Sequence, residues 1–166
     1  MSKEIPLTKG KIAIVDDELF DELSKYSWQT SNGFGKTWYA SRTTLVKEGR
    51  KFMAMHRQIL GLTPQDKVWV DHKNLNGLDN RRENLREATM RQNQQNRGGV
   101  AGKSSQYKGV SRVKSNGQWL AQITGKERHY NLGRHDNEED AARAYDTAAR
   151  EMHGEFAWTN FPLGDD

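Results

Sequence analysis

Short runs of hydrophobic and other strand-forming residues between polar stretches predict several short strands in the first half of the chain. The strand-like runs are residues 11–15, 37–41 and 50–55. Apolar residues recur at helical spacing after Asp16, which predicts a short helix that this aspartate caps. The inward side of that helix is expected to consist of Leu19, Phe20 and Leu23.

The middle of the chain predicts a strand, a polar loop, a second strand and a helix. Residues 68–72 (Val-Trp-Val-Asp-His) are strand-like and end in two side chains that can do chemistry. Residues 73–83 are rich in turn-forming side chains, and 84–86 form a short returning strand. Residues 87–96 are compatible with a helix.

The last third predicts a three-stranded antiparallel sheet packed on one helix. Residues 108–113 and 118–123 are strand-like on either side of the turn pair Asn116-Gly117, and a third strand is expected over 128–132. A helix follows over about 138–153, with Asp136 or Asn137 as its cap and Gly154 at its end. Its inward stripe is expected to be Ala141, Ala144, Tyr145, Ala148, Ala149 and Met152.

The composition favours two small domains over one large core. Hydrophobic residues make up 34% of the 166 residues, and the mean hydropathy is −1.00. Residues 98–105 are rich in Gly and Ser and lack periodic apolar side chains, so we expect a flexible linker there. One domain should then cover residues 1–97 and a second 106–163, with an α+β fold overall.

Several classes of protein are excluded by composition. The chain has no cysteine, which rules out disulfides and cysteine-based zinc sites. It has no apolar run long enough to span a membrane, and its first residues lack the apolar region of a signal peptide. We therefore expect a soluble, cytoplasmic protein that has no membrane partner, and no required protein partner is evident.

Charge is distributed very unevenly along the sequence. The net charge is +4, but residues 81–134 carry twelve Lys and Arg against three Glu, whereas residues 135–166 carry two Arg against nine acidic residues. A block this basic attracts phosphate polyanions. Because Tyr, Trp, Asn and Gln are interleaved with the basic residues, nucleic acid is the partner that this stretch indicates.

Four polar residues in the middle of the chain suit phosphodiester hydrolysis. A neutral His72 can accept a proton from water, and Asn84 can hold its imidazole in orientation. Asp71 offers a carboxylate oxygen and Asn93 an amide oxygen, the hard ligands that Mg²⁺ or Mn²⁺ prefers. Neighbours on a strand point to opposite faces, so Asp71 and His72 can converge only where the strand gives way to the loop.

The Asp71-His72 pair, followed by Asn84 and Asn93, resembles the ββα-metal fold of HNH nucleases, with a core over about 68–96. The likeness covers roughly residues 5–97 and is closest to the phage and intron homing-endonuclease branch, in which Asn replaces the final His. The resemblance implies that His72 is the general base, Asp71 and Asn93 are the metal ligands, and Asn84 is the orienting residue. It also implies a phage in a bacterial host cell as the setting. The basic candidates for DNA contact in this half are Arg81, Arg82, Arg86 and Arg91.

The second half resembles the apetala-two, or ethylene-response-factor, DNA-binding domain. The likeness covers residues 105–163, including Tyr107-Lys108-Gly109-Val110 and Asn160-Phe161-Pro162. Its helix is acidic, so we expect the sheet to face DNA. The candidate contacts are Lys108, Arg112, Lys114, Gln122 and Arg128. Plant members carry arginines where this chain has Lys108, Ser111 and Thr124, and a glutamate and a tryptophan where it has Gln122 and Asn131, so their base preference is not expected to transfer.

These observations predict a metal-dependent HNH endonuclease that a sheet-reading domain brings to double-stranded DNA. One such site handles one strand, so a monomer should nick rather than cut both strands. A non-catalytic DNA-binding regulator is the first alternative, and an RNA-binding accessory protein is a more distant one.

Overall fold

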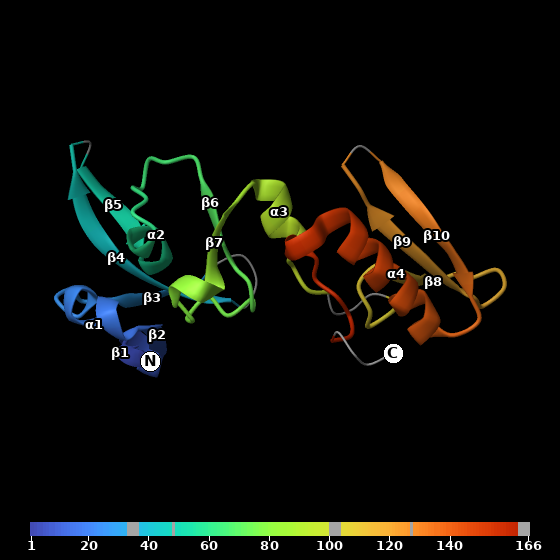
Figure 1. Ribbon diagram of the computed structural model, residues 1–166, viewed down its shortest axis with the longest axis horizontal. Coiled ribbons are helices and arrows are strands. Elements are labelled where there is room, and N and C mark those ends of the chain that lie inside the picture. The colour runs from blue at the N-terminus through green and yellow to red at the C-terminus, as the bar shows by residue number, and fades with distance from the viewer. Residues whose placement is uncertain (33–36, 48, 100–103, 127, 163–166) are drawn as a thin grey trace. The chain divides into compact units, whose positions relative to one another are not determined.

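The computed structural model of the protein describes residues 1–32, 37–47, 49–99, 104–126 and 128–162. Contacts divide the chain into two compact units, unit 1 (Met1–Asn93) and unit 2 (Gln94–Asp166). The elements combine helices with several small antiparallel sheets (Figure 1). Within the described ranges, no helix is both long enough and apolar enough to cross a membrane.

Unit 1 begins with a two-stranded sheet and a short helix. Strands β1 (Ser2–Pro6) and β2 (Ile12–Asp16) pair antiparallel, and α1 (Asp17–Leu23) follows. β2 and α1 match the predicted strand and helix closely, whereas β1 was not predicted. Asp16 stands at the predicted cap position but makes no capping bond, because its Oδ2 accepts the N–H of Arg82 at 2.8 Å.

A second sheet in unit 1 has the order β3-β4-β5. Its strands are β3 (Gln29–Asn32), β4 (Trp38–Val46) and β5 (Gly49–Ala54), and α2 (Met55–Ile59) follows directly. β4 is longer than the predicted run over 37–41. The outer part of the β4–β5 pair therefore extends well past the residues that contribute to the core.

The third sheet of unit 1 carries the predicted chemistry. Strands β6 (Trp69–His72) and β7 (Leu85–Ala88) pair antiparallel, with Asp71 opposite Arg86 and His72 opposite Leu85. The loop between them ends in a 3₁₀ turn over Arg82–Asn84, and α3 (Met90–Gln95) follows β7. The order strand, loop, strand, helix is as predicted, although the helix begins three residues later than the expected start at 87.

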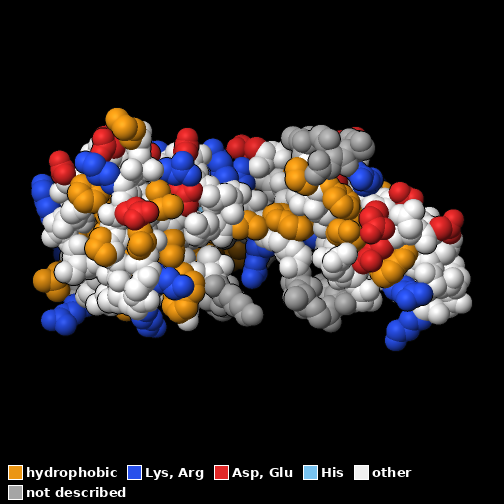
Figure 2. Space-filling model, turned by 90° about the horizontal axis from the view of Figure 1, so that it is seen from below, with side chains coloured by type: hydrophobic (Ala, Val, Ile, Leu, Met, Phe, Trp, Pro, Cys, Tyr) orange, Lys and Arg blue, Asp and Glu red, His pale blue; other side chains and the backbone are white. Residues whose placement is uncertain are grey.

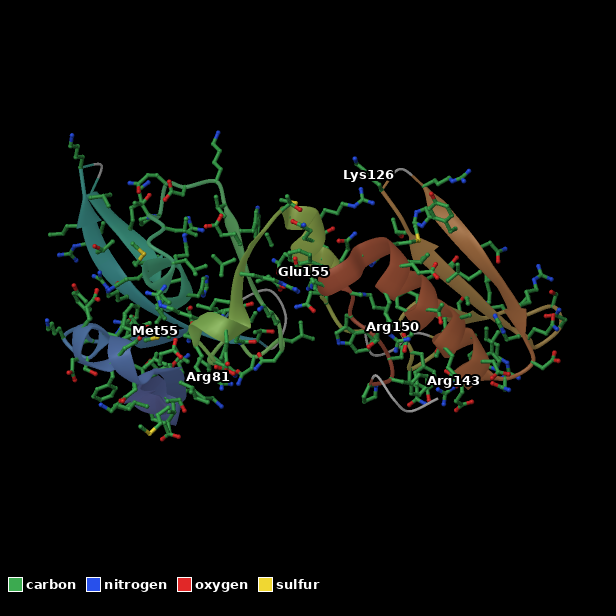
Figure 3. All side chains as sticks on the ribbon, viewed as in Figure 1. Met55, Arg81, Lys126, Arg143, Arg150 and Glu155 are labelled. Carbon is green, nitrogen blue, oxygen red and sulfur yellow. The ribbon has the colours of Figure 1, made fainter. Side chains whose placement is uncertain are left out.

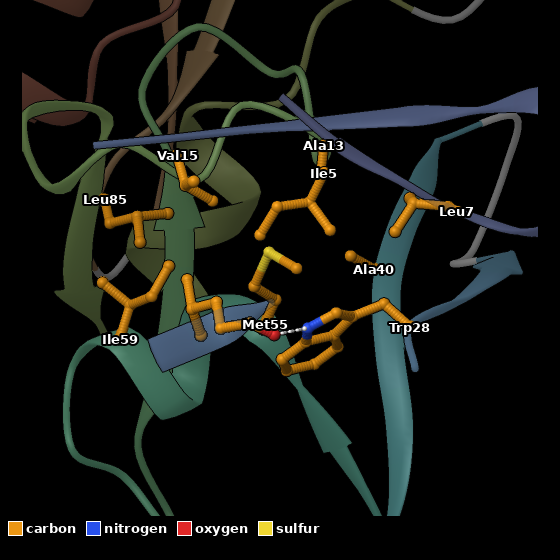
Figure 4. Close-up of a cluster of buried hydrophobic side chains, with 10 residues drawn as sticks. Ile5, Leu7, Ala13, Val15, Trp28, Ala40, Met55, Ile59 and Leu85 are labelled. Atoms are coloured by element: carbon orange, nitrogen blue, oxygen red, sulfur yellow. Dashed lines mark hydrogen bonds between the residues drawn. The ribbon is translucent and has the colours of Figure 1, made fainter. Parts of the chain in front are cut away.

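One hydrophobic core holds these elements of unit 1 together (Figure 4). Met55 of α2 is fully buried within it, and Trp28 donates its Nε1–H to the carbonyl of Leu23 at 2.8 Å. Trp69, at the start of β6, is outside this core and 46% exposed. The buried members of the cluster are Ile5, Leu7, Ala13, Val15, Leu23, Trp28, Ala40, Met55, Ile59 and Leu85.

Unit 2 is a three-stranded antiparallel sheet packed on a helix, as predicted. The strands β8 (Val110–Arg112), β9 (Trp119–Thr124) and β10 (His129–His135) have the order β10-β9-β8. Helix α4 (Glu138–His153) packs its small side chains against them, and a 3₁₀ turn (Gly154–Phe156) ends it. The buried side of α4 includes Ala142, which was not in the predicted stripe, whereas Met152 is 38% exposed.

Two local features fix α4 against the sheet. Asn137 caps the helix, accepting the N–H of Asp140 on its Oδ1 at 2.7 Å. Gly109 lies at φ +77°, and a Cβ there would come within 1.9 Å of the Tyr145 ring. The absence of a side chain at residue 109 therefore lets the sheet lie directly on the Tyr145 ring.

The described ends of the predicted linker are packed on unit 2. Ser105 is buried, and its Oγ donates to Glu138 Oε1 at 2.6 Å. Lys108 Nζ donates to the carbonyls of Gln95 and Arg97, both at 2.6 Å. Residues 100–103, the middle of that segment, lie outside the described residues. The boundary between the two compact units falls after Asn93, four residues before the predicted end of the first domain at residue 97.

Candidate active site and nucleic-acid surface

Asp71 and His72 end strand β6, and both are buried. Asp71 lies directly opposite Arg86 on β7, whose Nε and Nη2 donate to its Oδ2 at 2.8 and 2.7 Å. The Arg86 side chain is only 10% exposed, so this is a buried ion pair. Since adjacent strand residues point to opposite faces, Asp71 and His72 leave the ribbon on different sides.

Aromatic rings surround the imidazole of His72. The His56 ring lies edge-on to it with centroids 5.1 Å apart, and the Tyr39 ring is 5.7 Å from both histidines. Gly77 allows the loop to lie against Tyr39, because a Cβ at residue 77 would meet that ring at 2.6 Å. The side chain of His72 is therefore held by strand β4, helix α2 and the loop at the same time.

Burial sets the protonation state of both histidines. It lowers the pKa of His72, against the opposing effects of Asn80, Asp71 and Asp79. It lowers the pKa of His56 to about 3; the positive charge of Arg57, and that of His72 when it is protonated, act in the same direction. Both imidazoles are thus neutral near pH 7, the form in which a histidine accepts a proton.

Asn80 is a residue near His72 that sequence reasoning missed. Its side chain is completely buried, and its Oδ1 lies 3.5 Å from His72 Nε2. The sequence marked Asp79-Asn80 only as a turn. Since many Asn residues form turns, nothing in the local pattern distinguishes one that also faces an imidazole.

Asn84 braces the loop that carries Asn80. Its Oδ1 accepts the N–H of Asn74 at 3.0 Å, and its Nδ2 donates to the carbonyl of Asp79 at 2.7 Å. These two bonds join the start and the end of the loop across the strand pair. Both polar atoms of the Asn84 side chain therefore hold the loop that carries Asn80.

The same loop is also tied to the N-terminal sheet. Ile14 donates its N–H to the carbonyl of Leu78 at 2.8 Å and accepts the N–H of Asn80 at 2.7 Å. Asp79 lies between these residues and forms an ion pair with Arg81 at 2.7 Å. β2 thus places Asn80 at the site from a segment more than sixty residues away in sequence.

Asn93 lies on α3 and is partly buried. Its backbone N–H donates to the carbonyl of Thr89 at 3.0 Å, which fixes it in the first turn of the helix. Among the residues that the structure describes, no group of three His, Cys, Asp or Glu side chains is placed to hold a metal.

The arginines predicted to contact DNA in unit 1 have partners within the protein. Arg81 pairs with Asp79 and Glu83, both under 3 Å (Figure 3). Arg82 Nε lies 3.7 Å from Glu18, and Arg86 is buried against Asp71. Arg91 is partly buried on α3. Of these side chains, Arg82 is half exposed and keeps most freedom to reach a phosphate.

In unit 2, the register separates the predicted DNA contacts into two groups. Ala121 and Ile123 of β9 are buried against α4, so the alternate residue Gln122 lies on the open face of the sheet. The cross-strand partners place the following residues on that face: Ser111, Leu120, Gln122, Thr124, His129, Asn131 and Arg134.

The other predicted contacts lie at the edges of this sheet. Arg112 and Arg128 stack on the rings of Trp119 and Tyr130, at 5.6 and 4.8 Å from their centroids. Lys114 is exposed beyond β8. Lys108 donates to two backbone carbonyls, and burial lowers its pKa to about 8. These hydrogen bonds hold the Lys108 side chain against the backbone at the start of unit 2.

Charge distinguishes the two sides of unit 2. The first turn of α4 carries Glu138, Glu139 and Asp140, and acidic side chains gather over this helix in Figure 2. Lys126, at the β9–β10 turn, extends away from the sheet (Figure 3). A polyanion would therefore meet less repulsion at the sheet than at the helix.

Comparison with known proteins identifies both parts. The profile of an HNH endonuclease family matches residues 55–95, which contain Asp71, His72, Asn84 and Asn93. The profile of the AP2 domain matches residues 105–155. The fold and the site therefore define a protein that joins an HNH endonuclease segment to an AP2 domain.

An uncharacterized HNH endonuclease of Acanthamoeba polyphaga mimivirus is 33% identical over 156 residues, covering 92% of this chain and 76% of the viral protein. The chain belongs to the HNH endonuclease family.

The second half is similar to plant proteins. An AP2/ERF and B3 domain-containing protein of Oryza sativa subsp. japonica is 50% identical over 63 residues, or 38% of this chain. A transcription repressor of Arabidopsis thaliana with the same two domain types is 48% identical over 58 residues, or 35% of this chain. These matches span only 17% and 16% of the plant proteins, so the likeness concerns the AP2 domain alone.

Proposed function

We propose that the protein is a DNA endonuclease in which unit 1 hydrolyses a phosphodiester bond with a divalent metal ion and unit 2 binds the duplex. The observation that carries this proposal is the burial of His72, which follows Asp71 in sequence at the end of β6 and whose pKa is lowered by that burial. Both residues lie within the segment that matches the HNH endonuclease profile. In this proposal, residues 68–96 form the ββα-metal core.

His72 acts as the general base. Its imidazole takes a proton from the attacking water, a role that requires the neutral form that burial favours. The Tyr39 and His56 rings restrict its orientation, and the loop braced by Asn84 brings Asn80 against Nε2. Asn84 is in this account a positioning residue.

Asp71 and Asn93 are the proposed metal ligands. A carboxylate and an amide oxygen suit Mg²⁺ or Mn²⁺, and a site with two protein ligands leaves positions for phosphate oxygens and water. When bound, the ion supplies charge stabilisation for the phosphate and the leaving oxygen. Arg86 donates two hydrogen bonds to one Asp71 oxygen, so ligation by that oxygen requires Arg86 to move.

Unit 2 supplies the affinity for DNA through its open sheet face. A small sheet can enter the major groove, where amides and hydroxyls can hydrogen-bond to base edges. Gln122, Thr124 and Asn131 supply such groups on neighbouring strands, and Arg134 adds positive charge. Arg112, Lys114 and Arg128 at the edges are placed to contact phosphates.

The test is a plasmid-nicking assay with the full chain. We expect conversion of supercoiled plasmid to the nicked circle in Mg²⁺ or Mn²⁺, none in EDTA, and none with His72→Ala. Because one site handles one strand, nicked circles should precede linear plasmid. Nicking that is equal for His72→Ala and the wild type would contradict the assignment of the base.

A second candidate function is that of a DNA-binding regulator without nuclease activity. The buried Asp71–Arg86 ion pair favours it, since a carboxylate held by Arg86 is less available to a metal. Tight duplex binding with no nicking in any divalent metal would support this alternative.

A homing or phage-encoded role is a narrower form of the proposed endonuclease, and it predicts cleavage at a defined site in genomic DNA.

A further inference from the structure

The β4–β5 hairpin of unit 1 exposes large hydrophobic side chains outside the proposed active site. Leu45 of β4 is 78% exposed and Phe52 of β5 is 73% exposed. Figure 1 shows β4 and β5 side by side at the edge of unit 1. Exposed large hydrophobic groups that gather on one surface often mark a binding site.

The register places both side chains on one face of the hairpin. Leu45 lies opposite Arg50 and Thr43 lies opposite Phe52. Because directly opposite residues share a face and alternate residues of a strand do too, Thr43, Leu45, Arg50 and Phe52 form a single surface. All four are exposed, so this face of the strand pair has no packing partner among the described residues of unit 1.

The sequence around this surface is basic. Residues 42–52 contain Arg42, Lys47, Arg50 and Lys51 against the single acid Glu48. Arg42 stacks on Tyr26, 4.0 Å from the ring centroid, and also donates to Gln58, so its side chain is held against the rest of unit 1. Arg50 and Lys51, at the other end of the strand pair, are exposed.

We propose that the β4–β5 hairpin is a second DNA-binding element, which inserts into a groove of the duplex with Phe52 and Leu45 against the bases and Arg50, on the same face, against a phosphate at the edge of the groove. A two-stranded ribbon has the width that the major groove accepts, and apolar side chains can contact thymine methyl groups there. A second copy of this chain is a poorer occupant, since two such faces would bring like charges together. This inference rests on the proposal that DNA is the substrate.

Binding assays can separate the hairpin from the active site. They use the full chain with His72→Ala, so that affinity is measured without cleavage. We expect Arg50→Gln to weaken duplex binding several-fold and to reduce the salt dependence by about one unit of slope, as loss of one phosphate contact does. We expect Phe52→Ala to weaken binding about tenfold with an unchanged salt slope. Two substitutions at exposed residues elsewhere in unit 1 serve as controls. Lys25→Gln removes a positive charge, as Arg50→Gln does, and Ile12→Ala removes a hydrophobic side chain, as Phe52→Ala does.

A second measurement identifies the occupant directly. Replacement of Phe52 by p-benzoylphenylalanine, followed by irradiation, should cross-link the protein to duplex DNA. Cross-linking to another protein chain instead, or hairpin variants that bind DNA as the controls do, would overturn the proposal. Those results would leave the endonuclease assignment standing, because metal-dependent nicking by the chain with His72 intact tests that assignment separately.

Discussion

His56 is a partly buried base whose buried ring nitrogen Nδ1 has no hydrogen-bond partner among the residues that the structure describes. It packs edge-on against His72 and beside Tyr39, on the helix that also carries Arg57. No feature of the sequence assigns a role to one histidine on a short apolar turn. Its position now gives it two effects, which are to restrict the His72 ring and to make folding sensitive to acid.

Acid should destabilise the protein through His56. Its pKa is lowered to about 3 in the folded state, whereas the unfolded chain takes up the proton near 6.5. The stability present above pH 6.5 is therefore lost as the pH falls toward 3, by about 1.4 kcal/mol per pH unit. Urea unfolding at pH 6.5 and 5.0 should show a decline about 2 kcal/mol smaller in His56→Gln than in the wild type. An equal loss of unfolding free energy in His56→Gln and in the wild type would show that His56 already takes up the proton in the folded state.

The Asp71–Arg86 pair should contribute to stability in the absence of metal. Removing one partner leaves a buried charge uncompensated, a loss of about 3–5 kcal/mol in comparable pairs. We expect Arg86→Met to lower the free energy of unfolding by this order and Arg86→Lys to lower it less. Mg²⁺ should then stabilise Arg86→Met more than the wild type, since the ion can replace the lost positive charge beside Asp71. An equal effect of Mg²⁺ on the two proteins would argue against Asp71 as a ligand.

At the scale of elements, the loop between β6 and β7 separates the roles of two asparagines. Asn84 braces the loop, whereas Asn93 lies on α3. We expect Asn84→Ala to slow nicking at saturating metal, because added cation cannot restore the loop. Asn93→Ala should raise the metal concentration needed, and Asn93→Asp should keep it or lower it. Identical metal titrations for Asn84→Ala and Asn93→Ala would contradict this division.

The contact between the β8 segment and α4 predicts a large difference between two glycines. Gly109 (φ +77°) and Gly117 (φ +75°) have the same backbone strain when replaced by Ala, about 1 kcal/mol. At residue 109 the new Cβ would meet the Tyr145 ring at 1.9 Å, whereas at residue 117 it would make only an ordinary contact of 3.8 Å with the Arg112 side chain. Thermal unfolding should therefore show Gly109→Ala destabilised by several kcal/mol more than Gly117→Ala. Similar values for both would mean that Tyr145 can move aside.

Elements with strong local signals were predictable from the sequence, and pairings across the chain were not. The repeated alanines and the Asn116-Gly117 turn identified α4 and the β8–β9 hairpin. β1 was not predicted because Ile5 is the one buried residue of this strand, so its sequence shows no pattern of inward-facing hydrophobic positions. The bonds of Asp71 to Arg86 and of Lys108 to backbone carbonyls depend on register and packing, which no local pattern records.

At the scale of the whole molecule, we propose that unit 1 performs the chemistry and that unit 2 supplies most of the affinity for DNA. The uneven charge agrees with this division, since the basic residues run from the end of the nuclease segment through the sheet and the acids concentrate in α4. The two units are joined in one chain, so a duplex held by the sheet keeps a high local concentration near His72. Binding and cleavage should therefore be separable by mutation.

The single-turnover rate of DNA nicking by His72→Ala, at saturating protein and Mg²⁺, tests the central claim most directly. Loss of a general base typically slows a reaction by about 10²–10⁴-fold. We expect a loss in this range with duplex affinity within about twofold of the wild type, because a neutral imidazole adds little to phosphate binding. His153→Ala, a histidine change in unit 2, should leave the rate unchanged. A wild-type rate for His72→Ala would contradict the account.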